Sequence, residues 1–130
     1  MINILRKYLE PIIELETLLA IRILLKNTNG TLISVYPKRI ARICYLKESP
    51  PYLLMIGNVL RVLSAMDLGL YRTSSRYRSI YLLPKRSPLA NIISNSIVGL
   101  YELAKDVMNM SGNRYVRERR NMCRSEIIFD

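Results

Sequence analysis

Residues 59–83 read VLRVLSAMDLGLYRTSSRYRSIYLL, and the expected fold of the chain rests mainly on the pattern of these residues. Its apolar first half predicts a helix that ends at the Asp-Leu-Gly sequence of residues 67–69, because aspartate and glycine favour turns. A short strand follows, then a Ser-Ser turn flanked by arginines, then a second strand rich in tyrosine and leucine. The sequence therefore predicts a helix followed directly by a hairpin with a basic tip.

The residues that precede this stretch supply further elements. Apolar side chains at three- and four-residue spacing predict a helix over residues 11–26, and the β-rich run TLISVY predicts a strand over 31–36. Pro37 suits the first turn of a second helix, over 37–46, and Pro50 suits the start of a third, over 50–66. We also expect a short amphipathic helix at the N-terminus, over 1–9.

The run KRIARIC of residues 38–44 looks like the first helix of a helix-turn-helix, with residues 50–66 as the recognition helix. Together with the hairpin, the chain resembles the winged helix-turn-helix regulators of the small archaeal and bacterial dimeric type. The resemblance covers about residues 11–84 and rests on the order of the elements. It implies a mostly α fold with a small β-wing, flanking dimerisation helices, and double-stranded DNA as the partner.

The positive charge of the chain is concentrated on the same region. The net charge is +10, yet residues 1–36 and 89–130 each carry a net charge of only +1. Residues 37–88 hold ten basic and two acidic side chains, a net charge of +8. A basic patch on one supersecondary unit is the electrostatic footprint of a nucleic-acid-binding surface.

Three groups of side chains are candidates for DNA contact. Cations at the start of the second helix and in the turn after it suit the phosphate backbone: Lys38, Arg39, Arg42 and Lys47. Asn58 and Arg61 on the third helix suit adenine and guanine edges. The hairpin arginines can reach phosphates or a narrow minor groove: Arg72, Arg76 and Arg78. A solvated basic surface is the alternative interpretation for each group.

The third helix is apolar on more than one side, which leaves its outer face open to two interpretations. The expected core stripe is Leu53, Ile56, Leu60 and Leu63. On the opposite side, Leu54, Met55 and Val62 either touch thymine methyl groups or are buried against another element.

Residues 89–110 predict one long helix with a two-heptad apolar seam. The seam consists of Ile93, Ile97, Leu100, Ala104 and Val107. It either packs on the first helix of the same chain or pairs with a second copy, and we favour a homodimer. The expected organisation is a winged helix-turn-helix domain over 1–88, a dimerisation helix over 89–112 and a basic C-terminal tail over 113–130.

Composition argues against several other classes of function. The chain has no histidine, and its two cysteines, Cys44 and Cys123, are far apart, so we expect reduced thiols, no metal site and no cofactor. The acidic residues are scattered and no phosphate-binding loop occurs, so we expect no enzyme. We also expect no signal peptide and no membrane span. The absence of glutamine favours a thermophilic origin, and the expected location is cytoplasmic, on the nucleoid.

Our sequence interpretation is a dimeric DNA-binding protein, most readily a transcriptional regulator. The first alternative is a chromatin-like architectural protein that coats DNA with little sequence preference. The second is a winged-helix module of the replication or transcription machinery, whose apolar third-helix face docks on a protein partner.

Overall fold

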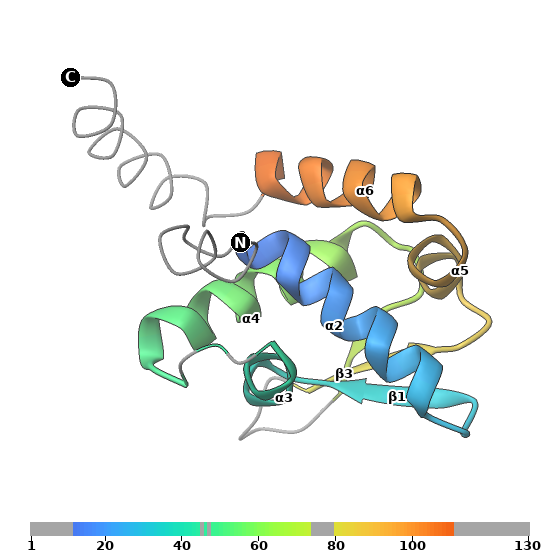
Figure 1. The fold of residues 1–130 in the computed structure, drawn as a ribbon, viewed down its shortest axis with the longest axis horizontal. Coiled ribbons are helices and arrows are strands. Elements are labelled where there is room, and N and C mark those ends of the chain that lie inside the picture. Colours follow the sequence, from blue (N-terminus) through green and yellow to red (C-terminus); the bar gives the residue numbers. More distant parts are fainter. Residues whose placement is uncertain (1–11, 45, 47, 74–79, 111–130) are drawn as a thin grey trace, which may run out of the picture.

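One helix, α2 (Ile13–Asn27), lies at the centre of the fold and contacts each of the other helices that the structure describes (Figure 1). The structure is a computed structural model that describes residues 12–44, 46, 48–73 and 80–110. The other helices of this part are α3 (Pro37–Ile43), α4 (Pro50–Ala65), α5 (Pro88–Asn95) and α6 (Ile97–Met110). The strands are β1 (Leu32–Val35), β2 (Tyr71–Arg72) and β3 (Tyr81–Pro84). The expectation of a mostly helical fold with a small sheet is confirmed.

Apolar side chains fix α2 at the centre. Leu18 and Ile21 are fully buried, and Leu24 and Leu25 continue the buried surface into the last turn. This three- and four-residue spacing puts the apolar surface on the side of α2 that its neighbours cover. The core cluster runs through all five described helices and the sheet, so α5 and α6 share one core with the elements before them.

The sheet is antiparallel, with β3 between β1 and β2. In its register Val35 is opposite Tyr81 and Ile33 is opposite Leu83, and all four side chains are buried. The period-two alternation of β3 sends Tyr81 and Leu83 to the core. On the other side of β3, the short edge strand β2 pairs Arg72 with Tyr81, and both residues of β2 are exposed.

The turn after α4 depends on two residues with positive φ. Asp67 has φ of 59° and Gly69 has φ of 110°. A Cβ at Gly69 would lie 2.4 Å from the Cβ of Ser87, so this position has no room for a side chain. Ser87 in turn caps α5, because its Oγ accepts a 3.2 Å hydrogen bond from the Ala90 N–H.

The expectation of one helix over residues 89–110 is wrong. The chain is extended at Ser96, with φ of −144° and ψ of 114°, and this residue separates α5 from α6. The Ser96 Oγ accepts a 2.9 Å hydrogen bond from the Gly99 N–H and so caps the start of α6. A serine that can bond to the backbone favours a new cap over helix continuation.

Because α5 and α6 are separate helices, the predicted heptad residues do not form one continuous apolar seam. Ile93, Leu100, Ala104 and Val107 are buried in the core of the chain itself, where α5 and α6 pack against α2. Ile97 is 45% exposed at the first turn of α6. The four buried side chains are therefore not available to a second copy in this fold, and packing on the first helix is the arrangement that the structure shows.

Three predicted segments lie outside the described residues: the helix over 1–9, the hairpin tip at 74–75 and the basic tail over 113–130. Within the described part of the chain, no helix has the length and apolar character needed to cross a membrane.

Candidate nucleic-acid interface

The outer face of α4 carries one exposed stripe. Leu54 is 68% exposed, Asn58 is half-buried and Arg61 is exposed. These positions are separated by four and three residues, so they lie above one another on the helix surface. The structure therefore brings the two predicted base-reading side chains, Asn58 and Arg61, onto one face beside a large apolar side chain.

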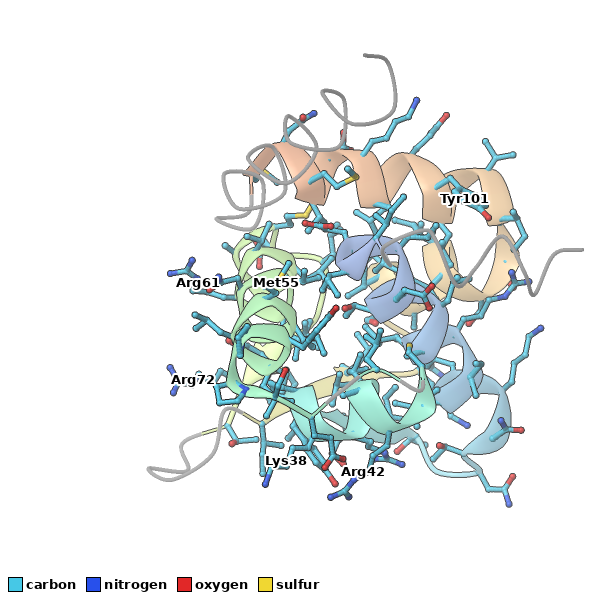
Figure 2. The ribbon with its side chains drawn as sticks, turned by 60° about the vertical axis from the view of Figure 1, so that its left-hand side comes forward. Lys38, Arg42, Met55, Arg61, Arg72 and Tyr101 are labelled. Carbon is cyan, nitrogen blue, oxygen red and sulfur yellow. The ribbon has the colours of Figure 1, made fainter. Side chains whose placement is uncertain are left out.

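The apolar part of this face is smaller than the sequence predicted. Met55, which we expected on the outer side of α4, is 7% exposed and belongs to the core, and its side chain points into the body in Figure 2. Val62 is half-buried and packs against the core cluster. The reason is that α3, α2 and α6 all pack against α4 and cover more than one stripe of it, so Val59 is buried as well.

A shallow hollow of about 250 Å³ lies between α4 and the sheet. The start of α3, the middle of α4, and strands β2 and β3 contribute its lining, which consists of Pro37, Leu53, Leu54, Gly57, Asn58, Arg61, Arg72 and Tyr81. The hollow thus joins the predicted recognition helix to the base of the predicted hairpin.

Arg61 and Arg72 provide the positive charge of this hollow. Both side chains are exposed, and Figure 2 shows them reaching outward on the same side of the molecule. Neither has a hydrogen bond or an ion pair within the described part of the chain. Two guanidinium groups without a competing carboxylate suit an anion with several oxygens, such as a phosphodiester.

Gly57 is a residue of this hollow that sequence reasoning missed. It lies in the interior of α4, where glycine is less favourable than alanine by about 1 kcal/mol. A Cβ at this position would be 3.8 Å from the Cγ of Pro37, an ordinary van der Waals distance. The packing of the protein therefore does not require glycine here. An isolated glycine inside an otherwise helical run was the available signal.

The three cations at the start of the second helix have different surroundings in α3. Lys38 is exposed and has no partner among the described residues. Arg39 is half-buried, and its guanidinium donates to the Ser34 carbonyl oxygen at 2.8 Å and to the Ser34 Oγ at 3.0 Å. Arg39 therefore links α3 to β1, and part of its hydrogen-bonding capacity is used within the fold.

Arg42 forms an ion pair at the surface. Its Nε lies 2.6 Å from Glu48 Oε1, and both side chains are well exposed, at 63% and 40%. An exposed pair of this kind contributes little to stability. It does offset the positive charge at the end of α3, so of the three predicted phosphate contacts in this helix Lys38 has the least competition. Figure 2 shows Lys38 and Arg42 at the same end of the molecule.

The remaining predicted contacts cannot be placed. Lys47, Arg76 and Arg78 lie outside the described residues. The base of the hairpin is described, and Arg72 on β2 sits opposite the buried Tyr81 of β3, so their side chains share one face of the sheet.

A second hollow, of about 440 Å³, lies between α2 and α3. Its apolar lining includes Ile23 and Ile43, and charged side chains of both signs, Glu16 and Arg22, stand among them. Cys44 also lines it, half-buried, and its Sγ donates a 3.1 Å hydrogen bond to the Glu16 carbonyl oxygen. The mixed charge does not select a ligand of one sign. Within the described residues no cluster of histidine, cysteine, aspartate and glutamate could hold a metal ion.

Comparison of the chain with protein-family models, curated proteins and solved structures finds no match. The interface therefore has to be interpreted from its own geometry and charge.

Proposed function

We propose that the chain binds double-stranded DNA as a winged helix-turn-helix protein, with α3 and α4 as the helix-turn-helix and β2–β3 as the base of the wing. The observation that carries the proposal is the hollow in which α4 and the β2–β3 hairpin meet, with Arg61 and Arg72 both lining it. The order α2, β1, α3, α4, β2, β3 supports it, because the hairpin follows α4 directly in the chain, and the sheet order β1-β3-β2 leaves β2 at an edge of the sheet.

In this proposal α4 enters the major groove. Asn58 hydrogen-bonds a base edge, and the exposed Leu54 contacts a thymine methyl group. Lys38, Arg61 and Arg72 contact phosphates; Arg61 is assigned there because it lines the hollow together with Arg72. The hairpin arginines Arg76 and Arg78 are assigned to the adjoining minor groove from the sequence alone. The protein acts by binding, with no catalytic step.

We also propose that the binding is sequence-specific and that the protein is a transcriptional regulator on the nucleoid. Its support is that Asn58 and the exposed Leu54 share one stripe of α4, because an amide that bonds adenine and an apolar side chain that touches a thymine methyl group can read neighbouring base pairs. An architectural protein would need only the phosphate contacts. The protein-docking alternative loses support from the structure, because Met55 is buried and Leu54 alone is strongly exposed on that face.

We also propose a homodimer, now through the outer face of α6. Val98 is 68% and Tyr101 is 48% exposed on this helix, and Figure 2 shows Tyr101 on the side of α6 away from Arg72. Glu102, Lys105 and Asp106 lie on the same helix, exposed. Carboxylates and an amine on one face can pair with an antiparallel copy of themselves in a two-fold contact.

The test of the proposal is titration of labelled duplexes of random sequence at several salt concentrations, followed by selection of bound sequences from a random duplex pool. We expect affinity to fall steeply with salt, because each phosphate contact adds about −0.9 to the slope of log affinity against log salt. We expect the selection to enrich a motif. Enrichment of none would support the architectural protein, and failure to bind any duplex at low salt would contradict the proposal.

A further inference from the structure

We infer that the hollow beside α4 is the seat of one sugar-phosphate strand of the duplex, and that position 57 is glycine so that this strand can approach the helix. The inference rests on the proposed function and assigns a specific part of the DNA to a specific part of the surface. It adds Gly57 as a positioning residue that no pattern in the sequence had marked for DNA contact.

The geometry of duplex DNA supplies the first step. In B-DNA the major and the minor groove are separated by the backbone of one strand. A protein that puts a helix into the major groove and a hairpin into the adjoining minor groove must therefore straddle that strand. The notch between α4 and the β2–β3 hairpin is the hollow described above, so the strand has to pass through it.

The charge and the lining of the hollow suit this occupant. Arg61 comes from the helix side and Arg72 from the strand side, and within the described residues no carboxylate pairs with either. Two guanidinium groups on opposite elements can hold the oxygens of one phosphate or of two neighbours. Between them the lining is apolar, with Pro37, Leu53 and Tyr81, which suits the carbon face of a deoxyribose.

Gly57 is the part of the lining whose identity the fold does not explain. An alanine would favour the helical backbone, and its Cβ would have an ordinary contact distance of 3.8 Å to Pro37. Stability alone therefore favours alanine at this position. A methyl group there would, however, occupy the hollow from the helix side. Glycine in contact with a ligand is expected where a backbone must come close.

The experiment compares Gly57→Ala and Gly57→Val with the parent protein, in thermal unfolding and in titration of a random-sequence duplex. For Gly57→Ala we expect a melting temperature at or above that of the parent, with duplex affinity reduced about tenfold and a flatter salt dependence. Gly57→Val should bind more weakly still. The matched control is Gly30→Ala, an equal substitution outside the hollow at a position with ordinary contacts, which should leave affinity unchanged.

A double-mutant cycle between Gly57→Ala and Arg61→Gln gives a second readout. If both residues act on the same strand, the combined loss is smaller than the product of the single losses. A cycle between Gly57→Ala and Lys38→Gln should come closer to the product, because Lys38 does not line the hollow.

The outcomes separate this inference from the proposed function. Parent-like affinity in Gly57→Ala overturns the strand assignment and leaves duplex binding intact. Loss of affinity together with a lower melting temperature also overturns it, because the glycine would then serve the fold. A parent protein that binds no duplex overturns both.

Discussion

Arg72 on β2 stands directly opposite Tyr81 on β3, and the pair lines the same hollow as Arg61 of α4. Tyr81 is 5% exposed, so it anchors the hairpin base to the core while Arg72 on the edge strand remains in solvent. The pairing therefore holds a cation at a fixed place beside α4. This relationship, rather than the number of basic residues, gives the first prediction.

Arg61→Gln and Arg72→Gln should each weaken binding to all duplexes and flatten the salt slope by about 0.9, because each removes one phosphate contact. The measurement is fluorescence anisotropy with a random-sequence duplex over a range of salt concentrations. Lys26→Gln, an equal change of charge at the exposed end of α2, is the matched control and should keep the parent slope. Equal flattening in all three variants would show that only the net charge matters.

Asn58→Ala should lower discrimination for a selected site by roughly 1–3 kcal/mol while affinity for random duplexes stays close to that of the parent. The reason is that a base contact, unlike a phosphate contact, is present only on the right sequence. Paired titrations on the selected site and on a scrambled site measure the effect. Equal losses on both sites would assign Asn58 to the backbone or to the fold and favour the architectural protein.

Substitution of Arg39 should lower the stability of the fold, whereas substitution of Lys38 should weaken DNA binding and leave stability almost unchanged. Arg39→Ala removes two hydrogen bonds to Ser34 and should reduce the free energy of unfolding by roughly 1–3 kcal/mol. Lys38→Ala should leave that free energy within about 0.5 kcal/mol of the parent, since the side chain is exposed, and should weaken duplex binding. Urea unfolding and duplex titration on both variants check this. Unchanged stability in Arg39→Ala would show that the bonds to Ser34 contribute nothing in solution.

Local signals predicted most of the fold. The starts of α3 and α4 were found because Pro37 and Pro50 occupy first-turn positions. The strands were found because apolar and aromatic residues cluster between turn residues. These features depend on a few neighbouring residues, so the sequence alone displays them.

Features that depend on distant contacts were missed. Ser96 could cap a helix or continue one, and the packing of α5 and α6 around α2 decides between the two. The burial of Met55 follows from the packing of α3, α2 and α6 against α4. For the candidate site, Asn58 and Arg61 were predicted together from helical spacing, whereas the hollow joins α4 to β2, and periodicity within one helix carries no information about that.

Gly69→Ala should be strongly destabilising, by about 1–3 kcal/mol from the positive φ alone and by more from the contact with Ser87. Because Ser87 caps α5, a displacement there should also release the hydrogen bond to the Ala90 N–H. Thermal unfolding measures the loss. Gly30→Ala is the matched control, since a Cβ there meets only ordinary contacts at 3.8 Å or more, and it should be close to neutral. Equal stability of the two variants would contradict the conformation of the 67–69 turn.

The last prediction concerns the homodimer: substitutions on the exposed face and on the buried face of α6 should have different effects. Val98→Asp with Tyr101→Asp changes the exposed face of the helix, so the fold should persist while the dimer dissociates. Leu100→Ala changes the buried face and should cost about 2–5 kcal/mol of stability without a specific effect on assembly.

Sedimentation equilibrium and thermal unfolding distinguish these effects. We expect the parent to sediment as a dimer at micromolar concentration, the double variant as a folded monomer, and Leu100→Ala as a dimer of lower melting temperature. A two-fold dimer would present two α4 helices about 34–36 Å apart, so dissociation should also weaken binding to a pseudo-palindromic site more than to a half-site. A monomeric parent would remove the dimer from the proposal, while a dimeric double variant would place the contact on a surface other than the outer face of α6.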